Sequence, residues 1–128
     1  MNPITKEWVR KAEGDWATAT REARARKRPN PDAVCFHAQQ CVEKYLKARL
    51  HHAGIACPRT HDLEAVLAML LPVEPLWAPW RIPLASLSYF AVVTRYPGDE
   101  ATKTQAKDAV KLCRQVRAAV RASLGLRA

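Results

Sequence analysis

The chain has 128 residues, of which 48% are hydrophobic and 26% are charged, as expected for one folded domain over residues 1–128. The hydrophobic content excludes a disordered chain, and no run approaches the ~18 apolar residues that a membrane-spanning helix requires. The net charge of +9 predicts attraction to an acidic ligand, whether RNA, nucleotide phosphates or an acidic protein.

The chain contains four cysteines, Cys35, Cys41, Cys57 and Cys113, and no C-x-x-C pair. Three of the four occupy apolar positions of helical patterns, so we expect small buried side chains in a reducing compartment. The N-terminal sequence MNPITKEWVRKAEGDW contains acids and lacks the apolar stretch of a secretory signal. A cytoplasmic, soluble protein is therefore expected.

Prolines and turn residues divide the first half of the chain into two predicted helices. The first begins near Thr5, a predicted N-cap, and ends in RARARKRPNP, where prolines forbid continuation. Its apolar positions recur every three or four residues, at Trp8, Ala12, Trp16, Ala19 and Ala23. The second helix runs from a cap at Asp32 to Gly54. Its broad apolar arc consists of Val34, Ala38, Cys41, Val42, Tyr45, Leu46 and Ala53.

Three more helices are predicted in the second half. Thr60 is the expected cap of a third helix, whose inward residues are Leu63, Val66, Leu67, Leu70 and Leu71. The segment PVEPLWAPWRIP contains too many prolines for regular structure, and we expect it to pack Trp77 and Trp80 over one end of the bundle. Pro83 suits the first turn of a fourth helix that presents Leu84, Leu87, Phe90, Ala91 and Thr94.

The last helix spans about Ala101 to Leu124, after a break at Pro97 and Gly98. It aligns Ala106, Ala109, Val110, Cys113, Val116, Val120 and Leu124. No period-two run bounded by hairpin turns predicts a strand. Short connections between amphipathic helices therefore predict an all-α, up-and-down helical bundle of about five helices with a four-helix-bundle-like core.

The second predicted helix also carries a polar stripe, formed by His37, Gln40, Lys44, Lys47 and His51. This stripe is either a face exposed to water or a recognition strip, in which lysines meet phosphate charge and Gln40 and His37 form hydrogen bonds, assembled across a dimer interface. Arg49 projects into the apolar arc, so it needs an acidic or backbone partner unless it extends past the helix end.

Three motifs occur in order along the chain. The first predicted helix contains W-x-x-x-A-E-x-D-W, the segment HAQQCVEKYLKARLHHAGIACPRTHDL contains A-Q-Q-x-x-E-K-x-L-K-A followed by T-H-D-L, and SLSYFAVVTRYPGDEAT contains R-Y-P. Together they resemble the signature of HEPN domains over nearly the whole chain. The resemblance implies a helical bundle that usually dimerises. It also implies one of three functions: the partner of a minimal nucleotidyltransferase in a two-component, often toxin and antitoxin, pair; a metal-independent endoribonuclease; or a nucleotide-binding accessory subunit.

The ribonuclease members of this family carry R-x(4-6)-H at the start of the last helix. Their arginine stabilises charge on the scissile phosphate and their histidine transfers a proton. Arg95 stands where that arginine is expected, but YPGDEATKTQ follows it and no histidine occurs beyond His61. The resemblance is thus to a subgroup with R-Y-P in place of the ribonuclease motif.

His61, in T-H-D-L, has two interpretations. As a structural residue it caps its helix or bonds to an acid of a neighbouring helix. As a variant catalytic residue it converges with Arg95 in a pocket, near the hydroxyl of Tyr96 and the carboxylate of Asp99. The first interpretation is the favoured one.

A basic stripe lies opposite the apolar positions of the last helix, at Lys103, Lys107, Lys111, Arg114, Arg117 and Arg121. From Lys103 to Ala128, seven bases accompany one acid, a net charge of +6. The stripe is either solvated surface or an electrostatic footprint for an RNA backbone or an acidic partner, and no aromatic residues interleave with it for base stacking. Phosphate loops, nucleophile elbows and zinc spacings are missing, so neither a metal nor a cofactor is expected.

These observations predict a HEPN-family accessory protein that binds nucleotide or RNA phosphates without intrinsic catalysis, forms a homodimer and pairs with a minimal nucleotidyltransferase. The predicted binding residues are the basic stripe together with His37, Gln40, Lys44, Lys47 and Arg95. One alternative is a ribonuclease toxin with a variant site at Arg95, His61 and Tyr96. A second is a purely structural interaction module.

Overall fold

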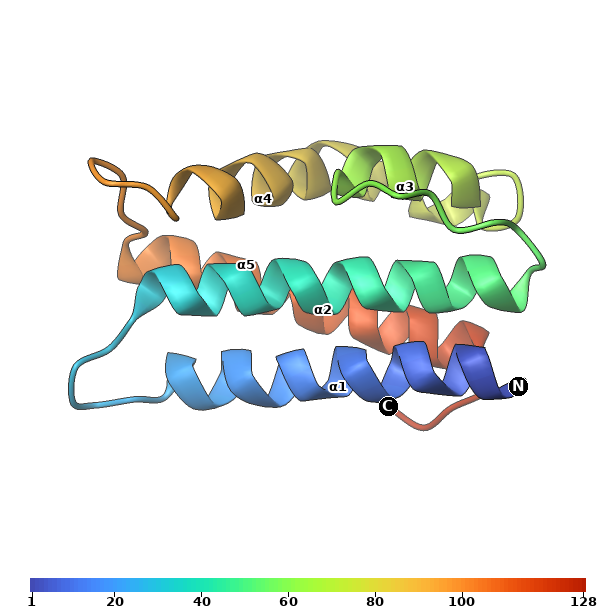
Figure 1. Cartoon of the computed structure of the whole chain (residues 1–128), viewed down its shortest axis with the longest axis horizontal. Helices are drawn as coiled ribbons and strands as arrows, with labels where there is room; N and C mark the ends of the chain where they lie inside the picture. The colour runs from blue at the N-terminus through green and yellow to red at the C-terminus, as the bar shows by residue number, and fades with distance from the viewer.

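A computed structural model describes all residues from Met1 to Ala128, and it contains helices and no strand (Figure 1). The elements are α1 (Pro3–Ala23), α2 (Pro31–His52), α3 (Leu63–Leu70), the 3-10 helix η1 (Pro75–Trp80), α4 (Arg81–Val93) and α5 (Lys103–Ser123). The prediction of an all-α bundle is confirmed. None of these helices combines the length and apolar character needed to cross a membrane.

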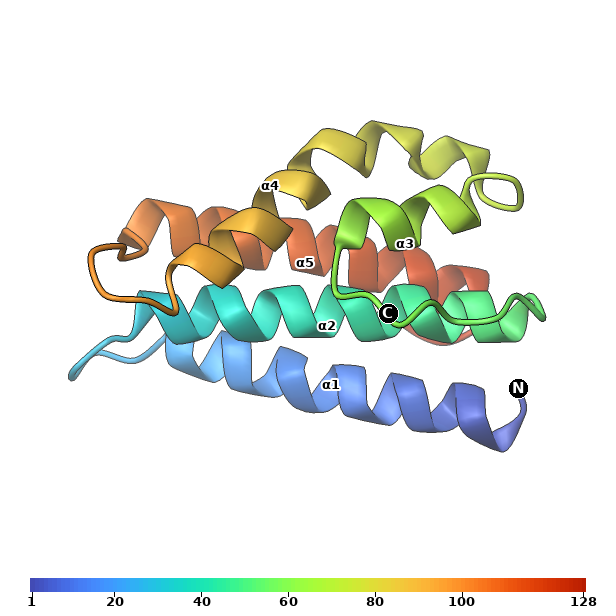
Figure 2. The same cartoon turned by 45° about the horizontal axis from the view of Figure 1, so that its top comes forward.

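The helix α2 lies at the centre of the bundle (Figures 1 and 2). It packs on α1 along one side, on α5 along another, and on α3 and α4 along a third. The four longest helices, α1, α2, α4 and α5, alternate in direction along the chain, while α3 and η1 form a short layer beside them. This is the up-and-down arrangement that the short connections between amphipathic helices predict.

Burial follows from this central position. The core combines the arc of α2 with one face of every other helix, and its fully buried large side chains are Tyr45, Leu46, Leu50, Leu63, Leu67, Leu70, Leu84, Val34, Val42, Val66, Val116 and Val120. Among the arc residues Ala53 is the exception, since it is exposed beyond the end of α2. The predicted inward residues of α5 are all buried.

The first three helix starts differ from the prediction. Asn2 caps α1 by accepting from the Thr5 backbone N–H at 2.9 Å, and Asn30 caps α2 by accepting from the Ala33 N–H at 3.1 Å. In each case a proline occupies the first helical position, where its missing N–H costs nothing, so the helix begins ahead of Thr5 and Asp32. The cap of α3 is Asp62, which accepts from the Glu64 N–H at 3.0 Å.

Thr60, predicted as that cap, lies two residues too early. Its hydroxyl instead accepts from the Asp62 N–H at 3.1 Å. The last helix begins at a capping box of Thr102 and Gln105, so its cap lies one residue after the predicted start at Ala101. Gly54 ends α2 as predicted, with a positive φ of 75° that a glycine adopts without strain.

The segment between α2 and α3 runs back along α2 instead of forming a tight antiparallel turn (Figure 1). Residues 53–62 contain no helix, and they return the chain from the end of α2 to its middle before α3 starts. This return places His61 beside the central turns of α2. The prediction of irregular structure between α3 and α4 is wrong, because Pro75–Trp80 forms a 3-10 helix. The rings of Trp77 and Trp80 in this helix pack together, with their centroids 5.4 Å apart.

Candidate functional site: a polar hollow between α2 and α4

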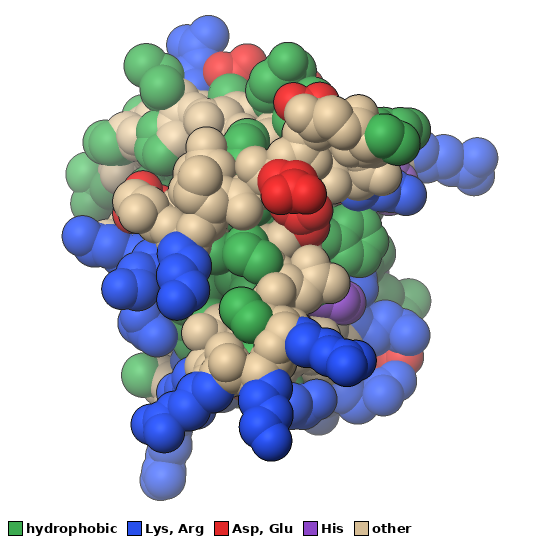
Figure 3. All heavy atoms as spheres, turned by 90° about the vertical axis from the view of Figure 1, so that its left-hand side faces the viewer, with side chains coloured by type: hydrophobic (Ala, Val, Ile, Leu, Met, Phe, Trp, Pro, Cys, Tyr) green, Lys and Arg blue, Asp and Glu red, His purple; other side chains and the backbone are tan.

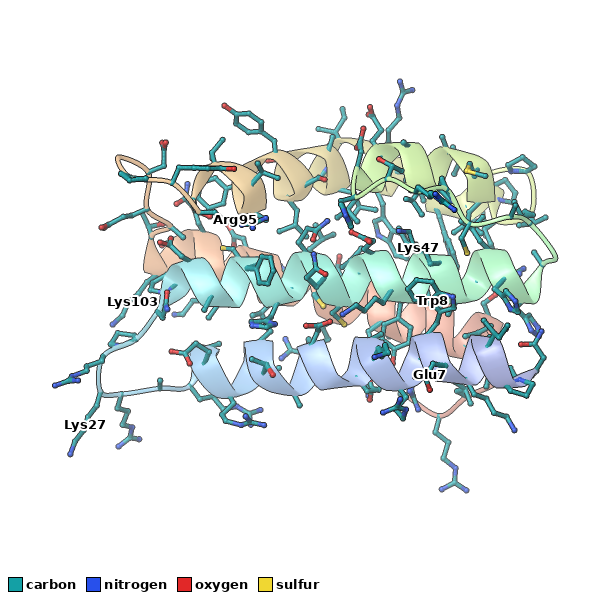
Figure 4. All side chains as sticks on the ribbon, in the orientation of Figure 1. Glu7, Trp8, Lys27, Lys47, Arg95 and Lys103 are labelled. Atoms are coloured by element: carbon teal, nitrogen blue, oxygen red, sulfur yellow. The ribbon has the colours of Figure 1, made fainter.

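A hollow of about 180 Å³ opens between the first half of α2 and the end of α4. Its walls carry both charged and apolar side chains: Phe36, Gln39, Gln40, His61, Ala91, Val92 and Arg95. In Figure 4, Arg95 lies between the ribbons of α2 and α4. The hollow therefore brings together three predicted site residues that are distant in the sequence, namely Gln40, His61 and Arg95.

A buried carboxylate positions His61. Glu43 is only 4% exposed, and its two oxygens lie 3.1 and 3.0 Å from Nδ1 of His61. A carboxylate only accepts hydrogen bonds, so Nδ1 carries the hydrogen and Nε2 is the ring atom left free. The His61 side chain is itself 81% exposed, which leaves Nε2 accessible to a ligand. The interpretation of His61 as the partner of an acid on a neighbouring helix is thus correct in structure.

The backbone around His61 is fixed as well. Its carbonyl oxygen accepts from Nε2 of Gln39 at 3.0 Å and from the Ser88 hydroxyl at 3.1 Å. The same hydroxyl accepts from the Leu63 N–H at 3.2 Å. Side chains of α2 and α4 therefore hold the last residues of the return segment, and this bonding keeps His61 at the rim of the hollow.

Lys47 completes this network inside the protein. Its Nζ donates to Glu43 at 2.9 Å and lies 5.9 Å from the centroid of the Trp8 ring (Figure 4). Because Lys47 is 6% exposed, its charge is compensated by Glu43 and by the face of an aromatic ring instead of by water. Gln40 reaches the network through Gln39, whose Oε1 accepts from Gln40 Nε2 at 2.9 Å.

Arg95 is the free charge of the hollow. It follows the C-cap of α4, and its Cζ atom lies 5.4 Å from the centroid of the Phe36 ring. None of the ion pairs of the structure involves Arg95, so the donors of its guanidinium remain available. A planar guanidinium with unpaired donors fits the oxygens of a phosphate group.

The size of the hollow limits what it holds. Pockets that enclose a small molecule have volumes of about 300–1,000 Å³, whereas this one has about 180 Å³. It therefore suits a single phosphate group or part of a nucleotide, with the rest of the ligand outside. Larger hollows of about 280 and 380 Å³ lie between α4 and α5 and beside α3, and neither contains a predicted site residue.

Three residues of the polar stripe of α2, His37, Lys44 and His51, contact α1, and Lys47 is buried, so the interpretation of the stripe as a water-exposed face is wrong. Nδ1 of His37 lies 2.9 Å from Asp15, and Lys44 donates to the same carboxylate. At the far end of the stripe, Nδ1 of His51 is 2.7 Å from the hydroxyl of Thr5, which is fully buried. The cause is that α1 supplies Asp15 and Thr5 opposite the stripe, and the pattern of α2 alone does not reveal these partners. Of the five stripe residues, only Gln40 lines the hollow.

The basic stripe of α5 divides into two parts. Lys103, Lys107 and Lys111 are exposed and have no ion-pair partner. Farther along, Arg117 donates to both oxygens of Glu13 at 2.7 Å, and Arg121 lies 3.7 Å from the same carboxylate. Arg114, between them, is exposed and lies 5.4 Å from the ring of Trp16.

The titration of the Glu13 cluster reflects these bonds. The hydrogen bond from Arg117, aided by that from Tyr45, lowers the pKa of Glu13 below its ordinary value of 4.5, against the opposing effect of burial. Burial and the bond to Glu13 raise the pKa of the Tyr45 hydroxyl. Glu13 is therefore a carboxylate and Tyr45 a neutral donor at neutral pH, so this cluster holds α1, α2 and α5 together.

The remaining predicted residues are placed as follows. Arg49 finds its acidic partner in Glu74, at 3.1 Å, and also donates to the Ser123 hydroxyl at 2.7 Å. Tyr96 is exposed and does not line the hollow. Burial and the nearby Asp32 raise the pKa of Cys35 to about 11. A hydrogen bond with the thiol of Cys113, together with burial, raises the pKa of Cys41. These thiols are inert.

Sequence reasoning missed two groups of residues that the site needs. Glu43 and Gln39 belong to the Q-Q-x-x-E-K motif, and the spacing of four between Gln39, Glu43 and Lys47 would have indicated one hydrogen-bonded row on α2. Phe36 and Ser88 carried no such signal, since their roles depend on how α4 packs on α2.

Comparison with known proteins gives one match. Residues 5–123 match the family model described as the HEPN domain, whereas no curated protein and no solved structure matches the chain. The matched range includes nearly all of α1, all of α2 to α5, and every residue that lines the hollow. The chain therefore belongs to the HEPN domain family.

Proposed function

We propose that this protein is a HEPN-family accessory protein that binds a phosphate group of a nucleotide or RNA in the hollow of Gln40, His61 and Arg95, without cleaving it. Membership of the family indicates a helical protein of the toxin–antitoxin or ribonuclease-related type. The observation that carries the proposal is the unpaired Arg95 in a polar hollow that is also lined by His61, whose Nε2 is free, and by Gln40. These groups supply the charge and hydrogen bonds that a phosphate requires.

The absence of cleavage rests on the sequence around Arg95. The R-x(4-6)-H motif of ribonuclease members is missing, and the residues that follow Arg95 form the exposed turn YPGDE before α5. Four free thiols agree with the cytoplasmic location that we propose with it.

We further propose a minimal nucleotidyltransferase as the partner, encoded separately, because HEPN domains often act in two-component pairs. Co-expression of the two chains with a tag on one of them tests this. Recovery of a stable complex from size-exclusion chromatography is the expected result, and separate elution at micromolar concentrations contradicts it.

A homodimer is also proposed, as HEPN domains often form dimers. Support comes from α4 and the turn after it, where four large apolar side chains are at least half exposed: Ile82, Tyr89, Val92 and Tyr96. Replacing Tyr89 by Glu is expected to shift the sedimentation coefficient to that of a monomer. Ile4→Glu, at an exposed apolar residue of α1, is the matched control.

The binding proposal is tested with ATP and with a short single-stranded RNA, by calorimetry. Arg95→Ala is expected to weaken ATP binding at least tenfold, because a charge-assisted pair is lost. Arg127→Ala, which removes another exposed arginine without an acidic partner, serves as the control and leaves ATP binding unchanged. Equal binding by the Arg95 variant and the wild type contradicts the proposal.

One observation favours the ribonuclease as a second candidate. The bond to Glu43 places the hydrogen of His61 on Nδ1, so Nε2 is free to accept a proton at a hollow that Arg95 also lines. In that reaction Nε2 takes the proton of a ribose 2′-hydroxyl and the 2′-oxygen attacks phosphorus. The bond from phosphorus to the 5′-oxygen of the next nucleotide breaks, that oxygen takes a proton from water, and a cyclic phosphate remains. Cleavage of RNA in EDTA that His61→Ala and Arg95→Ala both abolish would establish this candidate in place of the binding protein.

The structural module is the remaining alternative. It predicts that Lys44→Ala, Lys47→Ala and Arg95→Ala leave every binding activity unchanged. Because Lys44 and Lys47 are ion-paired to Asp15 and Glu43, their variants are compared at equal folded fraction. Under the proposed function Arg95→Ala has the largest effect of the three.

A further inference from the structure

Unpaired cations gather at one end of the bundle. Figure 3 shows this end, where Lys and Arg side chains spread over its lower and left-hand parts and acidic side chains lie above them. The cations come from the turn between α1 and α2 and from the first half of α5, and all are exposed: Arg24, Arg26, Lys27, Arg28, Lys103, Lys107 and Lys111. We call these seven residues the end surface.

The two segments are held next to each other by the fold. The carboxylate of Asp32, in the first turn of α2, accepts from the Ala101 backbone N–H at 2.6 Å, which ties the entrance of α2 to the entrance of α5. A hollow of about 210 Å³ lies between the turn and α5, lined by residues that include Pro29, Asn30, Lys103 and Lys107. Two bases of α5 therefore line a depression whose other wall is the turn that carries four of the other cations.

The charges of the end surface are not neutralised within the protein. None of its seven residues takes part in an ion pair. The acids close to them in sequence form no ion pair with them: Glu22, Asp32, Asp99, Glu100 and Asp108. The interior cations of the same protein do have acidic partners, so the unpaired positive charge of the protein lies on exposed side chains that a ligand can reach.

The surroundings of these bases favour nucleic acid over a protein. The exposed large apolar side chains of the molecule all lie outside residues 24–31 and 103–111. Protein interfaces depend on buried aromatic or aliphatic anchors, whereas phosphate contacts need only cations and hydrogen-bond donors. Residues 24–31 and 103–111 also contain no aromatic residue on which a base could stack, which indicates contacts to the backbone alone.

We propose that the end surface binds the phosphodiester backbone of nucleic acid independently of base sequence, at a site separate from the hollow of Arg95. The inference rests on the proposed function only in taking RNA as the natural ligand. Both sites lie toward the same end of the bundle, where Figure 4 shows Arg95, Lys103 and Lys27. A strand on the end surface can thus present one of its phosphates or its terminus to Arg95.

The test compares two triple variants that remove equal charge. Arg26→Ala/Lys27→Ala/Lys107→Ala removes three cations of the end surface, and Lys6→Ala/Lys11→Ala/Arg127→Ala removes three exposed cations elsewhere. Affinity for a short single-stranded RNA of mixed sequence, and for DNA of the same sequence, is measured by fluorescence anisotropy across a range of salt concentrations. The end-surface variant is expected to reduce the slope of log affinity against log salt by about 2, since each phosphate contact on a single strand contributes about 0.7. The control variant is expected to change the slope much less, and RNA and DNA to behave alike.

Three outcomes overturn the inference: an equal loss in the control variant, RNA affinity that falls only in Arg95→Ala, and polyglutamate of matched charge that binds as tightly as RNA. The ATP experiment separates the two proposals. If Arg95→Ala leaves ATP binding intact while the end-surface variant still lowers the RNA slope, the proposed function fails and the inference stands.

Discussion

Two groups of cations in this protein have the same chemistry and opposite surroundings. The interior group, Lys44, Lys47, Arg49, Arg117 and Arg121, lies between helices, and each member meets a carboxylate. The group on the end surface lies in the turn between α1 and α2 and on the first half of α5, and none of its members pairs with a carboxylate. Along α5 both groups belong to one continuous helical stripe, so periodicity does not separate them.

The difference separates cations that stabilise the fold from cations that are available to a ligand. Acids on α1 and α2, and Glu74 before η1, face the interior group, so its charges stabilise the packing of the helices. In the first half of α5 the lysine face is exposed, so its charge remains available. Removing a cation is therefore expected to affect stability in the first group and association in the second.

The largest effect is expected at Lys47. Replacing it by Met leaves the carboxylate of Glu43 buried without its cation, which costs about 3–5 kcal/mol in proteins. Chemical denaturation monitored by circular dichroism measures this loss. Glu43→Gln in the same chain removes the buried charge and is expected to restore part of the stability. A loss below about 1 kcal/mol, the level of an exposed ion pair, would show that Lys47 belongs with the surface cations.

A smaller loss is expected at Arg117. Its two hydrogen bonds to Glu13 are charge-assisted but partly exposed, so Arg117→Met is expected to destabilise the fold by about 1–2 kcal/mol. Lys111→Met, at an exposed lysine earlier on the same stripe, is the control. Equal midpoints of urea unfolding for the two variants would remove the distinction between the two groups.

The pH dependence of stability reports on the same cluster. The pKa of Glu13 is lowered in the folded protein, so its contribution is fully present above its ordinary pKa of 4.5 and is lost as pH falls through the lower folded value. Glu13→Gln is expected to be less stable than the wild type at neutral pH, with a difference that shrinks in acid. Stability curves measured from neutral pH to below pH 4.5 check this, and a constant difference would contradict it.

The smallest effect is expected on the end surface. Lys107→Met is predicted to change the free energy of unfolding by less than about 0.5 kcal/mol, because the residue is exposed and has no ion-pair partner. Thermal unfolding of this variant beside Lys47→Met gives the comparison directly. A substantial loss of stability would mean that the lysine forms a structural contact with the turn and is not available to a ligand.

The sequence predicted most of the fold for identifiable reasons. The apolar period of α5 predicted every buried residue from Ala106 to Leu124, and glycine and proline positions marked the breaks between helices. The exact caps were missed, because Asn2 and Asn30 come before prolines that are themselves good first helical residues. The Q-Q-x-x-E-K and T-H-D-L motifs were sufficient to recognise the family that the match to residues 5–123 shows.

For the site, the sequence supplied the residues and the tertiary structure decided their roles. Arg95, His61 and Gln40 were all candidates, yet only the return of residues 53–62 along α2 and the packing of α4 bring them into one hollow. A helical pattern gives the direction of a side chain from its own axis and says nothing about what a neighbouring helix presents there. For that reason Asp15, Glu13 and Glu43, supplied by the packing of α1 and α2, determined which cations became part of the interior and which stayed free.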